Sequence, residues 1–228
     1  MIKILKQKII KTLENIIKTG TKIERKNKFT IYSLYNYSLE LKNNELKEIE
    51  NLLSEPKKYK LEQELILFLE GETNINIYQH KNIQWWNNIG KKFINSYPNS
   101  FKYFNNLKEK IEQNNNSKNN ILYIGNNETS NFQPCLNLLH FQKLDNKLII
   151  GAYQRSCDAN LGFIADLFHI HLLSKYLNFG QTQLNILYGN IHIYENNIDK
   201  SIKLINEYLL NDKIDLTKYI FNYNDTKK

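Results

Sequence analysis

The order in which helical and strand-like segments alternate constrains the fold of this chain most. Apolar spacing and composition predict helices over residues 2–18, 61–69, 104–113, 161–177 and 198–210. Gly20 and Gly71 follow the first two as natural helix stops. Strands are predicted over residues 29–41 (which also fit a hairpin), 121–124, 147–154 and 184–188. Because strands and helices are interleaved without a strict repeat, we expect an α+β fold rather than a doubly wound sheet.

Length and composition narrow the class of protein. The chain has 228 residues, 41% of them apolar and 24% charged, which suits one globular domain spanning residues 1–228. Its two cysteines, Cys135 and Cys157, are too few for a disulfide scaffold, and such a chain needs no metal to fold. No apolar run approaches the ~20 residues of a membrane span, and lysines interrupt the N-terminal segment. We therefore expect a soluble, cytoplasmic protein.

The charge balance is basic, with a formal net charge of +8. This charge suits anionic partners such as nucleotides, polyanionic cofactors or nucleic acid. However, the lysines are scattered, and neither a recognition helix nor a basic stripe interleaved with aromatic residues is present in the sequence. The sequence therefore disfavours nucleic acid as the partner.

The first segment that could contain a catalytic residue is Pro134-Cys135, in which a cysteine directly follows a proline. Proline disfavours a helix, so a rigid turn can present the sulfur; the alternative is a buried cysteine acting as a small hydrophobe. About twenty residues later, Arg155 lies at the end of a predicted strand among amide, hydroxyl and carboxyl side chains. An arginine in such surroundings can bind a phosphate, and it can lower the pKa of a nearby thiol.

Four motifs in matching order resemble those of the thymidylate synthases and their nucleotide hydroxymethylase relatives. They are Gln154-Arg155-Ser156-Cys157-Asp158 followed by Leu161-Gly162, the Pro134-Cys135 segment, the run from Glu64 to Ile75, and Gly189-Asn190-Ile191-His192-Ile193-Tyr194. The resemblance covers residues 64–194 and is faint before them, where Arg25 is similar to part of a phosphate-binding loop. It implies a three-layer α+β fold with a mixed central sheet, in which residues 189–194 form a sugar-binding turn.

The resemblance also implies a mechanism. The Cys135 thiolate would add to carbon 6 of a pyrimidine nucleoside monophosphate, making carbon 5 nucleophilic toward the methylene group of 5,10-methylenetetrahydrofolate. Glu64 would manage protons and an ordered water. The residues implied to bind the nucleotide are Gln154, Arg155, Ser156, His192, Tyr194, Arg25 and, from a neighbouring subunit, Lys118. Those implied to bind the reduced folate are Trp86, Tyr97, Asp158 and Gly162.

One departure from the thymidylate synthases concerns the base. Their helix after the arginine motif carries an asparagine that pairs with uracil, and this chain has Asp166 there. A carboxyl group accepts from the amine of cytosine and, when protonated, donates to the ring nitrogen. If the base were uracil, a carboxylate oxygen would face the oxygen at position 4. Two hydrogen-bond acceptors would then oppose each other, which costs roughly 1–3 kcal/mol of binding free energy. The same exchange marks the phage deoxycytidylate hydroxymethylases; the alternative is that Asp166 is a carboxylate on a helix surface.

Other departures affect the phosphate site and the closing of the active site. Leu136 replaces a histidine after the nucleophile, His140 replaces a glutamine, and Lys118-Asn119 replaces two arginines that the neighbouring subunit donates. The tail, residues 223–228, lacks the histidine-proline segment that closes over the folate. A looser closure fits hydroxymethyl transfer, in which water must enter, better than reductive methyl transfer.

The residues and the resemblance together predict a folate-dependent hydroxymethylase that acts on carbon 5 of a cytidine nucleotide, most simply deoxycytidylate, with Cys135, Glu64 and Asp166 as its catalytic residues. The resemblance also implies a homodimer. Three alternatives stay open. The first is a divergent thymidylate synthase acting on deoxyuridylate, or an enzyme that methylates cytidylate. The second is a weakly active nucleotide-binding or partner-binding relative. The third is a basic DNA-binding module.

Overall fold

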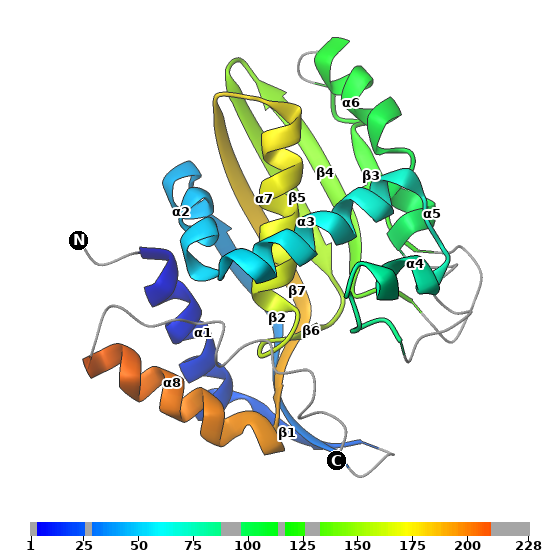
Figure 1. Ribbon diagram of the computed structural model, residues 1–228. Coiled ribbons are helices and arrows are strands. Elements are labelled where there is room, and N and C mark those ends of the chain that lie inside the picture. The colour runs from blue at the N-terminus through cyan, green and yellow to red at the C-terminus, as the bar shows by residue number, and fades with distance from the viewer. Residues whose placement is uncertain (1–3, 26–28, 88–96, 114–116, 126–132, 211–228) are drawn as a thin grey trace.

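The computed structural model describes residues 4–25, 29–87, 97–113, 117–125 and 133–210 (Figure 1). Its strands are β1 (Thr21–Glu24), β2 (Thr30–Leu41), β3 (Ile121–Tyr123), β4 (Leu136–Leu144), β5 (Lys147–Gln154), β6 (Cys157–Asp158) and β7 (Gln181–Tyr194). They form one sheet in the order β1-β2-β7-β5-β4-β3, and β6 continues from β5 along β7. β7 is parallel to β5 and β6, whereas the other pairs are antiparallel. The predicted α+β class and mixed central sheet are confirmed.

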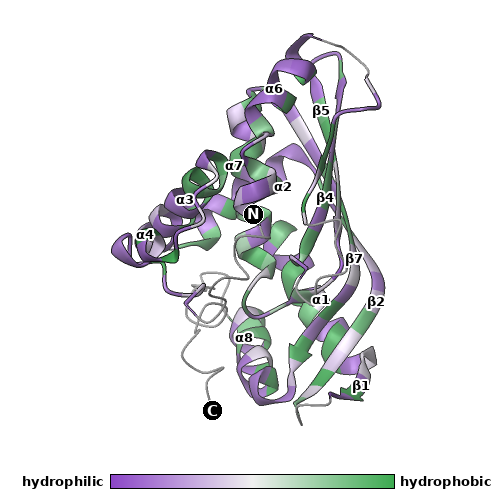
Figure 2. Cartoon of the chain, turned by 90° about the vertical axis from the view of Figure 1, so that its right-hand side faces the viewer, coloured by the Kyte–Doolittle hydropathy of each residue, from purple (hydrophilic) through white to green (hydrophobic). Residues whose placement is uncertain are grey.

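The helices lie in layers on one side of this sheet. They are α1 (Ile4–Thr19), α2 (Asn43–Glu48), α3 (Glu55–Glu70), α4 (Ile75–His80), α5 (Tyr97–Phe101), α6 (Phe104–Gln113), α7 (Phe163–Leu177) and α8 (Ile198–Leu210), with short 3-10 helices η1 (Ile49–Leu52) and η3 (Glu195–Asn197). α7 packs on the sheet and α3 crosses over α7, so the molecule has three layers: sheet, α7 and α3 (Figures 1 and 2).

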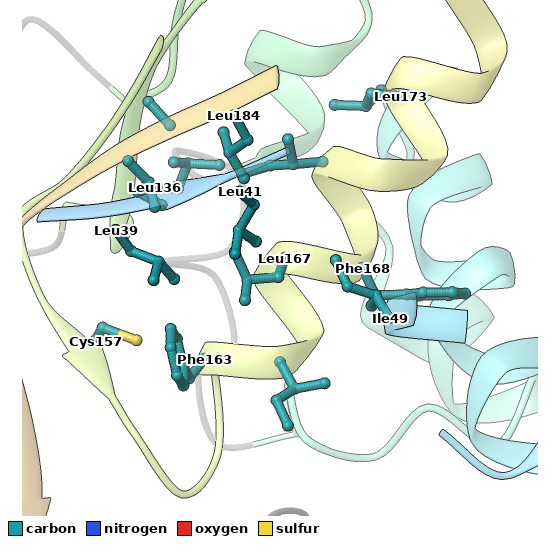
Figure 3. Close-up of a cluster of buried hydrophobic side chains, with 14 of the residues drawn as sticks. Leu39, Leu41, Ile49, Leu136, Cys157, Phe163, Leu167, Phe168, Leu173 and Leu184 are labelled. Carbon is teal, nitrogen blue, oxygen red and sulfur yellow. The ribbon is translucent and has the colours of Figure 1, made fainter. Parts of the chain in front are cut away.

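The sandwiched position of α7 explains its composition. A helix covered on both sides has no water-facing stripe, so it is apolar nearly all round. In Figure 3, Leu39 and Leu41 of β2 and Leu184 of β7 lie on the sheet side of Leu167, and Phe168 lies beside Ile49. Leu167 and Phe168 are both buried. The core therefore runs continuously from the sheet through α7 to the helices outside it.

The helix ends follow local chemistry. Gly71 adopts φ 73°, a left-handed conformation that favours glycine, and its N–H donates to Phe68 O at 3.1 Å. At the end of α1, the N–H of Gly20 donates to Ile16 O at 3.0 Å. Both predicted stops are confirmed. α3 begins at Glu55, earlier than predicted, because Pro56 in its first turn is compatible with a helix start.

One expectation about the sheet is wrong, and one strand was not predicted. Residues 189–194 do not form a turn: β7 runs on to Tyr194, far beyond the predicted strand over 184–188, because β2 pairs with it on one side and β5 and β6 on the other. The sequence analysis did not predict β4, which pairs with β3 and β5. In both segments, pairing with distant strands determines the conformation.

Among the described residues, no helix is both long and apolar enough to cross a bilayer. The same residues contain no group of three or more His, Cys, Asp or Glu side chains arranged to hold a metal ion.

Candidate active site

A cavity of about 310 Å³ lies between α3, α5 and α7, at the first residue of β4 and the last residue of β5. Nine of the residues predicted to form the site line it: Glu64, Trp86, Tyr97, Cys135, Gln154, Ser156, Asp158, Gly162 and Asp166. They come from segments as much as 100 residues apart. The fold therefore brings together a thiol, three carboxyl groups and an aromatic wall.

Cys135 lies immediately before β4; the residue as a whole is exposed, and it lines the cavity. The hydroxyl oxygen of Tyr97 accepts hydrogen bonds from the backbone N–H groups of Cys135 and Leu136, both at 3.2 Å. Tyr97 is itself held by stacking on Phe68 of α3, with ring centroids 5.3 Å apart. The cysteine is therefore positioned through its backbone, which leaves the thiol free to face a ligand.

The surroundings of the thiol disfavour its ionised form. Burial by the surrounding walls and the charge of Asp166 raise the pKa of Cys135 to about 11, although Arg155 opposes the shift. The expected influence of Arg155 is present, but the net shift is opposite to the predicted one because desolvation is the larger effect. At neutral pH these surroundings favour the protonated thiol.

Arg155 braces the segment that carries Cys135. Its Nε donates to Pro134 O at 2.9 Å, and a second guanidinium N–H donates to Gln133 O. Its backbone N–H donates to Cys135 O at 2.9 Å. The side chain is exposed and does not line the cavity, so its role in phosphate binding stays a prediction.

Asp166 lies in the first turn of α7, one turn after Gly162 at the helix start. Gln154 Nε2 donates to its Oδ2 at 2.6 Å and to Ser156 O at 3.2 Å, which orients both side chains. Burial raises the pKa of Asp166 to about 6. This carboxyl therefore changes charge close to neutral pH, unlike one on a helix surface.

Glu64 is 2% exposed and projects from α3 into the cavity. The indole N–H groups of Trp85 and Trp86 both donate to its Oε1. Trp86 was predicted only as a stacking surface for the folate, and Trp85 was not singled out. The paired tryptophans, about twenty residues after Glu64, were the signal available for this contact.

His169 is a second cavity residue that the sequence analysis missed. Its Nε2 lies 3.0 Å from Leu61 O and 3.3 Å from Glu64 Oε2. Burial disfavours its charged form, but the hydrogen bond and charge of Glu64, with the charge of Asp166, outweigh burial and raise the pKa of His169. Its spacing of three residues from Asp166 places both on one helix face.

A separate cluster contains the residues implied to bind the sugar. Arg25 donates to the hydroxyl of Tyr194 at 3.4 Å, and His192 Nδ1 donates to Asn190 Oδ1 at 2.7 Å. Burial, with the charge of Arg25, lowers the pKa of His192 to about 4, so the imidazole is neutral at pH 7 and Nε2 is an acceptor. None of these residues lines the cavity, but His192 pairs in register with Asp158, which does.

The remaining predicted site residue, Lys118, is exposed in the turn before β3 and does not line the cavity. The tail over 223–228, which the sequence analysis compared with the closing segment of the thymidylate synthases, lies outside the described residues.

The shifted pKa of Asp166 has a consequence for stability. Its pKa rises from the ordinary 3.8 to about 6 on folding, so the folded chain binds this proton more tightly and stability falls as pH rises through that interval. We expect Asp166→Asn to raise the free energy of unfolding at pH 7 by about 1–2 kcal/mol, less than the ~3 kcal/mol of the full shift because the side chain is partly exposed. Near pH 4 the gain should vanish.

Urea denaturation at several pH values measures this effect. Asp145→Asn, the same exchange at an exposed turn between β4 and β5, is the matched control and should change stability little. Asp158, whose pKa burial also raises to about 6, keeps part of the pH dependence in both variants. An Asp166→Asn protein no more stable than the parent at pH 7 would contradict the assigned environment.

A cysteine, carboxyl groups of raised pKa and stacked aromatic residues in one cavity of an α+β fold define an enzyme site for nucleophilic attack on a planar ligand. Comparison with known proteins gives the family. A family model described as "Thymidylate synthase" matches residues 7–226. The chain belongs to the thymidylate synthase family and is a one-carbon transferase that acts on a pyrimidine nucleotide.

Comparisons with individual relatives agree with this family assignment. The chain is 26% identical over 219 residues to a thymidylate synthase of Buchnera aphidicola subsp. Acyrthosiphon pisum, covering 86% of this chain and 82% of the relative. It is 29% identical over 188 residues to that of Wigglesworthia glossinidia brevipalpis, covering 70% of each. A match to the thymidylate synthase of Fusobacterium nucleatum subsp. nucleatum has 34% identity over 97 residues, covering 40% of this chain and 35% of the relative.

Proposed function

We propose that this enzyme transfers a hydroxymethyl group to carbon 5 of a cytidine nucleotide, most simply deoxycytidylate, using 5,10-methylenetetrahydrofolate as the one-carbon donor. The observation that carries the proposal is Asp166: a carboxyl of raised pKa, oriented by Gln154, in the cavity that contains the Cys135 thiol.

The raised pKa makes Asp166 a usable proton donor. With a pKa of about 6, protonating this carboxyl at pH 7 costs about 1.4 kcal/mol, against roughly 4 kcal/mol at the ordinary value of 3.8. When the Cys135 sulfur bonds to carbon 6 of cytosine, electron density moves toward ring nitrogen 3. The Asp166 proton passes to that nitrogen, and the carboxylate then accepts from N3–H and the exocyclic amine.

Asp166 would stabilise the addition of the Cys135 sulfur to uracil less well than its addition to cytosine. Its nitrogen 3 already carries hydrogen, and charge develops on the oxygen at position 4 as the sulfur adds. A carboxylate beside that oxygen opposes the developing charge, whereas an amide N–H would stabilise it. The carboxyl at position 166 therefore supports cytosine as the base.

The later steps need a base and water. The bound folate supplies the methylene carbon that becomes attached to carbon 5. Glu64, with its charge compensated by the two indole N–H groups, accepts from a water at the reacting base. Loss of the carbon 5 proton and departure of tetrahydrofolate would leave an exocyclic methylene on the base. Addition of that water to this methylene and departure of the Cys135 thiolate would then give the hydroxymethyl product.

The cavity also suits a reduced folate. Trp85 and Trp86 provide apolar faces for a planar ring. Asp158 Oδ1 accepts from Asn160 N at 2.9 Å, but its Oδ2 is buried without a hydrogen-bond partner and can accept from ring N–H groups. Asp158 would hold the pterin, with Gly162 and Tyr97 nearby on the cavity wall. Arg155, Ser156 and Arg25 would bind the phosphate, and His192 Nε2 and Tyr194 the sugar hydroxyl.

We also propose a homodimer formed through the face of the sheet opposite α7, which no described helix covers (Figure 2). Tyr153 pairs in register with Leu187 and Leu138, and Leu138 with Tyr123, so these side chains share that face. Tyr123 is 70% exposed, and Tyr153 and Leu187 are each 39% exposed. A second copy would cover this apolar surface, and Lys118 would then serve the partner's phosphate site.

The second candidate is methylation of deoxyuridylate. The named relatives are thymidylate synthases, which favours this reaction, and it uses Cys135 and Glu64 in the same way. The position of Asp166 is the observation against it.

Product analysis separates the two. Incubated with 5,10-methylenetetrahydrofolate, the enzyme should convert deoxycytidylate to its 5-hydroxymethyl derivative and release tetrahydrofolate. Formation of dihydrofolate is the control signal, because reductive methyl transfer oxidises the folate and hydroxymethyl transfer does not. Conversion of deoxyuridylate alone, with dihydrofolate released, would reject the proposal in favour of the second candidate.

A further inference from the structure

Of the described residues that line the cavity, one is a histidine, His169. It lies in the middle of α7 and is 9% exposed. The roles proposed so far leave it unused.

Its Nε2 faces two groups on α3. Leu61 O lies at 3.0 Å and Glu64 Oε2 at 3.3 Å. The carbonyl and the carboxylate both accept only, so Nε2 carries the hydrogen. Leu61 and Glu64 lie three residues apart and therefore share the face of α3 that crosses α7.

These contacts complete the clamp around Glu64. Its Oε1 is held by the indole N–H groups of Trp85 and Trp86, while Oε2 lies beside His169. With the indole N–H groups on Oε1 and the imidazole beside Oε2, the carboxylate cannot rotate about its last bond without losing the indole hydrogen bonds. A base held in this way keeps its free lone pairs in one direction.

We infer that His169 is a positioning residue for the one-carbon transfer: its Nε2–H holds Oε2 of Glu64 so that the carboxylate faces the reacting pyrimidine. The inference rests on the role proposed for Glu64. His169 acts through that carboxylate and does not contact the nucleotide. The Leu61 carbonyl keeps the imidazole in place.

α7 offers a matched control in His171, two residues further on. His171 is also buried, and its Nε2 lies 2.9 Å from a carboxylate oxygen, Glu50 Oε1. This pair does not line the cavity. If the His169–Glu64 pair only stabilises the fold, replacing His169 should affect kcat as little as replacing His171 does. If the pair positions Glu64, replacing His169 should lower kcat and replacing His171 should not.

The experiment compares His169→Ala, His169→Gln and His171→Gln with the parent, using whichever pyrimidine nucleotide the parent converts. We expect His169→Ala to lower kcat about 10- to 100-fold with the nucleotide KM changed less than about 3-fold. His169→Gln should recover kcat to within about 5-fold, because the Gln amide N–H replaces Nε2–H. His171→Gln should keep kcat within about 2-fold, whatever its effect on stability.

Unchanged kcat in His169→Ala, or an equal loss of kcat in His169→Ala and His171→Gln, would overturn the inference. Glu64→Gln, alone and combined with His169→Ala in single-turnover assays, separates this failure from failure of the role given to Glu64. We expect the double variant to be no slower than Glu64→Gln alone. A full additional loss in the double variant would reject only the inference about His169, whereas a fully active Glu64→Gln would reject the role of Glu64 and the inference with it.

Discussion

Replacing Cys135 with alanine should lower turnover by at least about 10³-fold while leaving nucleotide affinity within about 3-fold of the parent. The sulfur forms the bond that makes carbon 5 reactive, and no other described side chain at the cavity offers an accessible thiol, since Cys157 is buried. Affinity should persist because Tyr97 holds the segment through backbone N–H groups that alanine retains.

The measurements are steady-state turnover and calorimetric titration with the nucleotide. Cys157→Ala is the matched control: it removes a buried sulfur from the same cavity and should reduce stability rather than turnover. With 5,10-methylenetetrahydrofolate present, a 5-fluoro nucleotide, which cannot lose a proton from carbon 5 after methylene transfer, should leave a covalent adduct on the parent and none on Cys135→Ala, visible as intact mass. Substantial turnover by Cys135→Ala would exclude the covalent mechanism, and an inactive parent would favour a nucleotide-binding relative.

The second large effect concerns the base. Asp166→Asn should lower activity on deoxycytidylate by about 10²- to 10⁴-fold, because asparagine cannot transfer a proton to ring nitrogen 3. Activity on deoxyuridylate should rise by at least about 10-fold. With a pKa of about 6, Asp166 is mostly charged at pH 7, and the exchange removes that charge from beside the oxygen at position 4.

The pH dependence of the parent gives an independent measurement. Activity of the parent on deoxycytidylate should fall as pH rises above about 6, since the proton donor is then lost, and the residual activity of Asp166→Asn should lack this limb. Other groups that interact with the carboxyl include Gln154, His169, Glu64, Cys135, Cys157, Tyr97 and Tyr188. Asp145→Asn serves again as the exposed control. An Asp166→Asn enzyme with unchanged preference between the two nucleotides would show that position 166 does not select the base.

Much of the fold could be predicted because its signals are local. Gly20 and Gly71 end α1 and α3 as expected, and the apolar run over 161–177 predicted α7 nearly to its ends. The full length of β7 and the existence of β4 could not be predicted in the same way. The residues of these segments do not show a clear strand pattern on their own. Pairing with strands far away in the chain determines their conformation.

The same distinction between local signals and long-range contacts holds for the site. From the sequence, motif order and the family resemblance predicted that Cys135, Glu64 and Asp166 act together, and the structure places all three at one cavity. Only the tertiary structure decided their partners: Trp85 and His169 on Glu64, Gln154 on Asp166, and Arg155 on the Pro134 carbonyl rather than in the cavity. It also decided that burial raises the pKa of the thiol despite the nearby Arg155. The physical reason is that hydrogen-bond partners and desolvation depend on which helices cross and how closely they pack, and a one-dimensional order of residues does not contain that distance information.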